Sequence, residues 1–246
     1  MACERPEILV LQLDPEAPPG LIATVADRAG LRLTVRDREV VRSAPDELAS
    51  ARGLIVLGSA AAAVEPDEGI LAALGERARA DRPVLAVGTG VQLLALALGG
   101  ALQPGGSHEF GYVDLVPTPP AAADPVLRGL GAGLPVMEWH DEGIALPEAV
   151  EVLAHCVRWR VQAFRHGRTV YGLRFHPGAT IEVVRRWAAL RGVAANNPAV
   201  PVRIGAEIVR HQERAERFGS SVVEGWLGLV RARNEATSSG TSLERS

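Results

Sequence analysis

The stretch that decides the fold is Pro83-Val84-Leu85-Ala86-Val87-Gly88-Thr89-Gly90-Val91-Gln92-Leu93-Leu94-Ala95. Its first five residues are apolar, which is typical of a buried strand, and residues 92–98 form a helical pattern that ends at Gly99-Gly100. A strand that turns directly into a helix has the geometry of a nucleophile elbow, where the residue at the turn projects its side chain above the sheet. Here that residue is Gly88, which has no side chain to project.

The sequence before and after this stretch alternates between strand and helix patterns. Strands are expected at residues 7–13, 31–36, 53–58 and 83–87, and helices at 21–29, 67–82 and 92–98. Such alternation is typical of a parallel sheet with helices on both faces. We therefore predict a three-layer α/β/α fold with a mostly parallel central sheet.

The second half of the chain follows a different pattern. Short strands at residues 111–116, 150–154, 161–165 and 169–174 predict a partly antiparallel extension of the sheet, followed by a helix at 181–190. Helical spacing continues over 204–233, with an interruption expected near Gly219, and the Ser/Thr/Gly-rich residues after it favour disorder. The predicted organisation is a domain at 1–190, a helical extension packing on it at 191–233, and a disordered tail at 234–246.

Composition excludes several classes of function. The chain has 246 residues and a net charge of −3, with charges of both signs spread along it, so no nucleic-acid-binding footprint is present. All 26 basic side chains are Arg, and without Lys neither a Schiff base nor a Walker-type phosphate loop can form. No signal peptide or membrane-spanning stretch is recognised, so a cytoplasmic protein is expected, and the Arg-, Ala- and Gly-rich composition suggests a GC-rich bacterial source.

The chain has two cysteines, Cys3 and Cys156. Two cysteines provide neither a disulfide scaffold nor a four-cysteine zinc site. Cys3 lies near the start of the chain, and Cys156 is expected to be a small, half-buried apolar residue at the end of a strand.

Two motifs together resemble the class I glutamine amidotransferases, of the stand-alone type similar to the amidotransferase domain of GMP synthase. The elbow of that family reads roughly P-V-L-G-I-C-L-G-H-Q-L-L-A, and residues 83–95 match it at Pro83, Gly90, Gln92 and the following leucines. The family's F-H-P-E motif after a Y-G-L-Q strand corresponds to Tyr171-Gly172-Leu173-Arg174-Phe175-His176-Pro177-Gly178. Further similarities lie at 9–12, 109–112, 139–141 and 162–164. The resemblance implies a flavodoxin-like fold over about residues 8–187.

The resemblance also implies a reaction that this chain lacks the residues to perform. Family members hydrolyse glutamine with a Cys–His–Glu triad in which cysteine attacks the side-chain amide. The matching positions here are Gly88, His176 and Gly178, so no thioester is expected. Thr89 lies one residue past the elbow and is not expected to replace the cysteine. His176 lacks its orienting partner unless a carboxylate such as Glu109, Asp141 or Glu142 approaches it.

Other parts of the family's site are retained. Backbone N–H groups at Gly58-Ser59 and Thr89-Gly90, with the dipole of the helix that begins there, predict a site for an anion or a carbonyl oxygen. Gly88 itself is expected to relieve backbone strain, because glycine tolerates a positive φ. By position in the motifs, Gln92, Glu109, His140 and Asp141 are candidate ligand-binding residues. Neither a cofactor nor a metal is predicted.

These observations leave two principal functions open. One is an amidotransferase homologue that has lost catalysis and binds a small molecule or a protein, such as a synthetase, an amidotransferase or a second copy of itself. The other is an enzyme with rebuilt acid–base or metal-assisted chemistry in the same cleft, using polar residues near the expected strand ends. The candidates for that role are His108, Glu109, His140, Asp141, Glu142 and His176.

A third reading, dinucleotide binding, is weak. Gly88-Thr89-Gly90 follows a strand and opens a helix, as the dinucleotide fingerprint requires. However, Leu93 stands at the third glycine position, and no acidic residue closes a following strand at the required distance.

Overall fold

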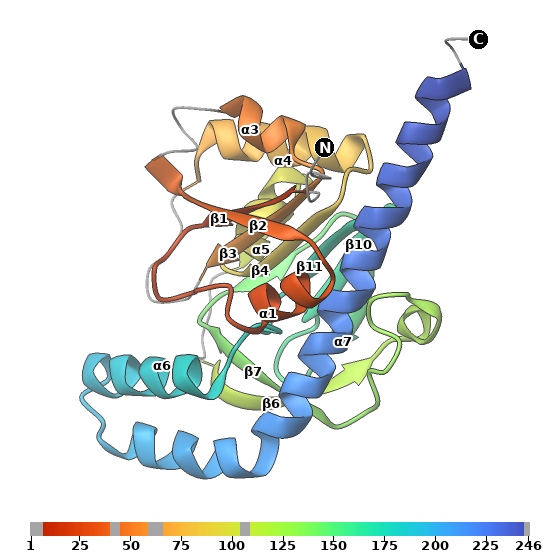
Figure 1. Cartoon of the computed structure of the whole chain (residues 1–246). Helices are drawn as coiled ribbons and strands as arrows, with labels where there is room; N and C mark the ends of the chain where they lie inside the picture. Colours follow the sequence, from red (N-terminus) through yellow and green to blue (C-terminus); the bar gives the residue numbers. More distant parts are fainter. Residues whose placement is uncertain (1–6, 40–44, 59–65, 104–108, 244–246) are drawn as a thin grey trace.

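The computed structural model describes residues 7–39, 45–58, 66–103 and 109–243 (Figure 1). It confirms the predicted three-layer α/β/α fold. A nine-stranded sheet runs in the order β2-β1-β3-β4-β11-β10-β9-β6-β7, and β5 pairs with β8 in a separate two-stranded sheet. The bounds of the strands are β1 Glu7–Gln12, β2 Arg32–Asp37, β3 Gly53–Gly58, β4 Val84–Gly88, β5 Ala101–Gln103, β6 Glu109–Pro117, β7 Leu134–His140, β8 Gly143–Ala145, β9 Glu151–His155, β10 Ala163–His166 and β11 Val170–Leu173.

The pairing of the strands changes from parallel to antiparallel at β11. Strands β2, β1, β3, β4 and β11 pair in parallel, whereas β10, β9, β6 and β7 join through antiparallel pairs. The predicted antiparallel extension is therefore present. The helices are α1 Leu21–Arg28, α3 Pro45–Ser50, α4 Glu68–Arg79, α5 Gly90–Ala97, α6 Ile181–Ala194 and α7 Ala199–Leu243, with a 3-10 helix η1 at Pro119–Ala123.

Alternate residues of each central strand face different layers. On β1, Ile8 and Val10 pack with residues of α1 and α7, whereas Leu9 and Leu11 pack with residues of α4 and α5. This separation follows from the two-residue period of a strand, which points successive side chains to opposite faces. Both faces are buried, so the strands read as continuous apolar runs.

A third apolar cluster lies at the antiparallel end of the sheet. It joins Met137 and Trp139 of β7 to Val184 and Trp187 of α6, and it includes Ile204 at the start of α7. Figure 1 shows α6 and the first part of α7 side by side beside β6 and β7. This cluster therefore joins the antiparallel end of the sheet to α6 and α7.

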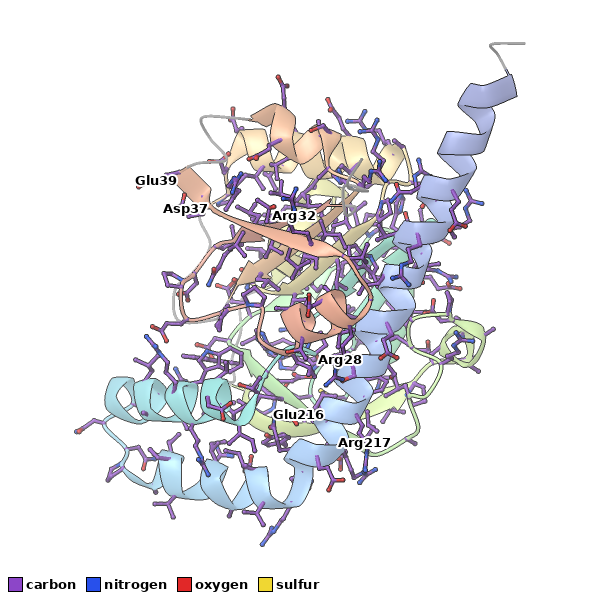
Figure 2. All side chains as sticks on the ribbon, viewed as in Figure 1. Arg28, Arg32, Asp37, Glu39, Glu216 and Arg217 are labelled. Carbon is purple, nitrogen blue, oxygen red and sulfur yellow. The ribbon has the colours of Figure 1, made fainter. Side chains whose placement is uncertain are left out.

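The outer edge of the sheet is polar. Strand β2 is the edge strand beside β1, and Arg32 and Asp37 on it are exposed (Figure 2). Charged side chains on an edge strand oppose pairing with strands of other molecules. In open α/β sheets, ligands bind instead at the carboxyl ends of the central strands.

The structure corrects the sequence prediction in several places. Strands β5, β7 and β8 and helix α3 were not expected. Helix α7 runs without a break through Gly219, and it includes residues 234–243 of the predicted disordered tail. The chain packs so closely at Gly219 that a Cβ there would lie 2.3 Å from the carbonyl oxygen of Pro177. Gly219 therefore allows α7 to pack closely against Pro177 and does not interrupt the helix. Within the described residues, no helix is both long enough and apolar enough to span a membrane.

Candidate functional site

The elbow after β4 has the geometry expected of it but lacks a reactive side chain. Gly88 ends β4 with a φ of 60°, a conformation that side-chain-bearing residues rarely adopt. Gly90 lets α5 approach β3 closely, since a Cβ there would lie 2.4 Å from the carbonyl oxygen of Val56. The retained glycines therefore keep the turn between β4 and α5.

The space in which a cysteine side chain would begin is already occupied. A Cβ on Gly88 would lie 2.1 Å from the carbonyl oxygen of Gly58 and 2.5 Å from Cε1 of His176. Both separations are well below van der Waals contact. The elbow, Gly58 and His176 are thus packed together without room for a nucleophile.

His176 is held in an apolar setting beside β7. Its backbone N–H donates to the carbonyl oxygen of Met137, and its ring lies edge-on to Trp187 with 4.6 Å between centroids. The side chain is buried, and Nε2 has no hydrogen-bond partner among the described residues. Burial, assisted by the nearby charge of His140, lowers the pKa of His176 to about 3. The imidazole is therefore neutral at physiological pH.

The third triad position is closed by the segment before α1. The carbonyl oxygen of Gly178 accepts a hydrogen bond from the N–H of Leu21, and a Cβ on Gly178 would lie 2.6 Å from the carbonyl oxygen of Pro19. The cavity beside His176 and Gly178 has a volume of about 10 Å³. A glutamate carboxylate at this position would have no space beside His176.

One N–H group of the predicted backbone anion site faces the protein itself. The N–H of Thr89 points to the carbonyl oxygen of Gly58, at 3.4 Å, and Thr89 is buried. Ser59, the other residue expected to contribute an N–H group, lies outside the described residues, as do Cys3 and His108. The N–H group that would bind an oxyanion is therefore directed at the protein's own backbone.

Two further predicted residues, Gln92 and Asp141, each contact a charged side chain. Gln92 donates through Nε2 to the carboxylate of Glu142, at 3.3 Å. Asp141 forms an ion pair with Arg191 of α6, with 3.8 Å between Oδ1 and Nη2. Neither contact brings a carboxylate into hydrogen-bonding distance of Nε2 of His176.

A second, more polar cluster lies between β6, β7 and β10. His140 Nε2 is 2.6 Å from Glu138 Oε2 and 3.2 Å from Glu109 Oε2. The side-chain amide of Gln162 donates to both carboxylates, at 2.7 Å and 3.2 Å. Arg174 donates to His140 Nδ1, at 2.8 Å. All five side chains are less than a tenth exposed, so this is a buried network of ionisable groups.

The ionisation of this network follows from its burial and mutual contacts. Burial raises the pKa of Glu138, which is fully buried. For Glu109, burial opposes ionisation, but hydrogen bonds with His140 and Glu138 and the nearby charges of His140 and Arg158 together outweigh burial and lower the pKa. For His140, contacts with both carboxylates outweigh burial and raise the pKa. Because Arg174 can only donate, its hydrogen bond requires a lone pair on Nδ1, which places the proton of a neutral His140 on Nε2.

Cys156 connects this network to a larger cavity. Its thiol is buried and accepts hydrogen bonds from Gln162 Nε2, at 3.1 Å, and from the backbone N–H of Trp159, at 3.3 Å. Its Sγ lies 3.9 Å from each carboxylate oxygen of Glu109. Burial raises the pKa of the thiol, so it is protonated at neutral pH. Cys156 and Arg174 line a cavity of about 880 Å³.

The structure therefore groups the predicted residues in two places. Gly58, Gly88, Thr89 and His176 meet at the elbow, whereas Glu109 and His140 belong to the buried network. Sequence reasoning missed Glu138, Gln162 and Arg174 as members of that network. The first of these lies on β7, a strand that was not predicted, and one signal was available: Arg174 stands where the family motif has glutamine.

Comparison with known proteins identifies the family of the chain. The family model for glutamine amidotransferase class I matches residues 23–185. The chain is 34% identical over 135 residues to a glutamine-hydrolyzing GMP synthase of Porphyromonas gingivalis, covering 54% of this chain and 26% of that protein. It is 36% identical over 101 residues to a glutamine-hydrolyzing GMP synthase subunit from Sulfurisphaera tokodaii, covering 40% of this chain and 52% of that protein.

A solved structure extends the similarity over nearly the whole fold. The crystal structure of a glutamine amidotransferase from Methylobacillus flagellatus superimposes with a TM-score of 0.78 at 21% sequence identity, covering 92% of this chain and 95% of that one. For the two relatives compared by sequence, the matches span about a quarter and about half of their lengths.

Proposed function

The chain belongs to the class I glutamine amidotransferase family, and we propose that it is a member that binds a small molecule or a partner protein without hydrolysing glutamine. The observation that carries this proposal is the packing at Gly88. The direction in which a nucleophile would extend from the elbow is filled by the carbonyl oxygen of Gly58 and the ring of His176.

The neighbouring groups support the same conclusion. Among the described residues no carboxylate is hydrogen-bonded to Nε2 of His176, and the buried ring stays neutral above a pH of about 3. Cys156 does not replace the missing nucleophile, because its thiol is protonated and hydrogen-bonded within a separate network. Without a thiolate at the elbow, the thioester route has no first step.

Partner binding is the form of this function that the relatives suggest. The Sulfurisphaera protein is named as one subunit of GMP synthase, so domains of this family occur as one part of an assembly. We propose that this chain also forms a complex with a synthetase, an active amidotransferase or a second copy of itself. In that complex its cleft binds a ligand and does not produce ammonia.

The test is a glutaminase assay on the purified full chain. We expect no ammonia release above the buffer rate, and no covalent labelling at residues 84–97 by a diazoketone analogue of glutamine. Calorimetry with glutamine in the same preparation measures whether the cleft still binds the amino acid. Ammonia release that disappears in Cys156→Ala would overturn the proposal, because it would identify Cys156 as a working nucleophile.

A second candidate function is acid–base chemistry without a covalent intermediate. The observation that favours it is the Glu109–Glu138–His140 cluster, in which two carboxylates and an imidazole share hydrogen bonds. This reading predicts that His140→Gln removes an activity found in a substrate screen. His176→Gln serves as the matched comparison, since His176 lies outside the cluster; loss of activity only in the latter variant would exclude the cluster.

A further inference from the structure

We propose that Glu109, Glu138, His140 and Cys156 form a binding site for one divalent transition-metal ion, with Zn²⁺ as the best match. The proposed metal site would serve the second candidate function, acid–base chemistry, but metal binding does not depend on any reaction taking place. Its test measures metal binding alone, so its failure would leave the glutaminase result unaffected.

The spacing of the donor atoms fits a single ion. One ligand atom from each of Glu109, Glu138 and His140 lies within 4.8 Å of the other two. The thiol of Cys156 is 3.9 Å from either carboxylate oxygen of Glu109. Zn–N, Zn–O and Zn–S bonds of normal length place tetrahedral ligands about 3.3–3.8 Å apart. The separation between Cys156 and Glu109 therefore lies just above that of two ligands on one tetrahedral ion.

Atoms within the cluster that lack partners point to an additional cation. Glu138 is fully buried, yet its Oε1 has no hydrogen-bond partner among the described residues. Gln162 is also fully buried, its Oε1 is likewise unpartnered, and its amide nitrogen faces Glu109, Glu138 and Cys156. The two hydrogens of that amide face three acceptor groups. Buried polar atoms normally have partners, and a bound cation would supply one for Glu138.

Gln162 also has a second orientation available to it. Rotation of its amide by half a turn exchanges Nε2 and Oε1, which are nearly equivalent in shape. Without a cation that rotation would place Oε1 against two carboxylates. With a cation in the cluster, Oε1 becomes a further oxygen ligand and Nε2 leaves the acceptors. The same side chain can thus present either its nitrogen or its oxygen to the cluster.

The donor set selects the type of metal. A thiolate and an imidazole beside carboxylates suit Zn²⁺, whereas Mg²⁺ and Ca²⁺ take oxygen ligands almost exclusively. Cys156 also lines the cavity of about 880 Å³, which gives an ion a route to the cluster. Coordination by the thiol releases its proton to solvent and forms the metal–sulfur bond, so no oxidant or reductant is needed.

The present position of Arg174 opposes binding of a metal ion by His140. A metal on His140 Nε2 requires the ring proton on Nδ1, where Arg174 now donates. Binding therefore requires the guanidinium to leave His140 and keep its other acceptors, the carbonyl oxygens of Val161 and Glu142. Arg174→Gln, which restores the residue of the family motif, supplies an oxygen that accepts from Nδ1–H. We expect this variant to bind metal more tightly than the wild type.

The experiment titrates the tag-free, chelator-treated full chain with Zn²⁺ against a chromophoric chelator, and with Co²⁺ by absorption spectroscopy. We expect one ion per chain and a thiolate-to-Co²⁺ charge-transfer band. Cys156→Ser should lose that band, whereas Cys3→Ser, the matched control, should keep it. Glu138→Gln and His140→Gln should each weaken Zn²⁺ binding at least about tenfold, the lower limit seen when support for a metal ligand is removed. Glu148→Gln, which lines the same cavity outside the cluster, should bind as the wild type does.

Circular dichroism and thermal melts establish that each variant is folded. Because Glu138→Gln and Cys156→Ser are nearly isosteric, they address the same question if His140→Gln fails to fold. Absence of stoichiometric binding in both the wild type and Arg174→Gln would overturn the proposal. So would a charge-transfer band that survives Cys156→Ser, or equal Zn²⁺ affinity in the wild type and a folded Glu138→Gln variant.

Discussion

The ring of His176 lies where the side chain of residue 88 would begin: its Cε1 atom is 2.5 Å from the position of a Cβ on Gly88. In a working cysteine–histidine pair, the two side chains lie within hydrogen-bonding reach and leave room for the substrate between them and the oxyanion donors. Here the histidine and the elbow backbone are closer than any such arrangement allows. A glycine at the elbow and close packing of His176 against it are therefore found together.

Restoring the triad residues should not restore the reaction. From the motifs alone, Gly88→Cys combined with Gly178→Glu would be expected to recover some glutaminase activity. The structure changes that expectation, because the new Cβ atoms would lie 2.1 Å from the carbonyl oxygen of Gly58 and 2.6 Å from that of Pro19. We expect a folded double variant to release no ammonia, measured beside the wild type. Ammonia release proportional to enzyme concentration would show that the backbone relaxes around the new side chains.

Gly88→Ala isolates the backbone part of this effect. A φ of 60° is unfavourable for alanine, and the added methyl meets the carbonyl oxygen of Gly58. We expect the free energy of unfolding in urea to fall by about 1–3 kcal/mol or more. Gly30→Ala is the matched control, because it has a similar φ of 69° and nothing within 4 Å of the added Cβ. If both variants lose the same amount, strain alone accounts for the change and crowding at the elbow contributes nothing.

Helix α7 should be sensitive to an added methyl at one glycine and not at another. At Gly219 a Cβ would lie 2.3 Å from the carbonyl oxygen of Pro177, whereas at Gly228 it would meet nothing within 4 Å. Gly219→Ala should lower the free energy of unfolding by about 1–3 kcal/mol. Gly228→Ala should raise it by up to about 1 kcal/mol, since alanine favours a helix more than glycine does. Urea unfolding monitored by circular dichroism measures both, and equal effects would contradict the close packing at Gly219.

Stability should depend on pH through His176. Its pKa falls from 6.5 to about 3 on folding, so between these values the unfolded chain binds a proton that the folded chain does not. Its contribution to stability is therefore complete above about pH 6.5 and is lost as the pH falls toward 3, with a limiting slope of about 1.4 kcal/mol per pH unit.

His176→Phe removes this titration. Across the range from about pH 6.5 to 4, its free energy of unfolding should fall less steeply with decreasing pH than that of the wild type. His211→Gln, on α7 beside Tyr112, provides the control for replacing a histidine elsewhere. Parallel pH profiles for His176→Phe and the wild type would contradict the pKa shift.

The sequence was sufficient to predict the central sheet because its strands carry strong local signals. Residues 53–58 and 84–88 are continuous buried runs, and the turn at Gly88 is followed directly by α5. His176 was identified in a different way, through the resemblance of its F-H-P motif to that of the family.

Strand β7 could not be predicted in this way. It contains Pro135, which normally argues against a strand interior, and two ionisable residues that are nevertheless buried. Glu138 is tolerated there because Gln162 of the loop before β10 donates to it, and His140 because Arg174 donates to its ring. These partners come from distant parts of the chain, so no local pattern reveals them. Residues 19–22 close the cleft beside Gly178, which is also distant from them in the chain, so no local pattern predicts that contact either.

The position of Trp226 has a consequence for how the protein is made. Its indole N–H donates to the carbonyl oxygen of Val84 at the start of β4, and its ring is fully buried against the sheet. The central strand is thus covered by a residue that the ribosome adds some 140 positions later. Until α7 has emerged, the face of the sheet that it covers stays open to water and to other nascent chains. We therefore expect the sheet to complete its packing only after α7 has been synthesised.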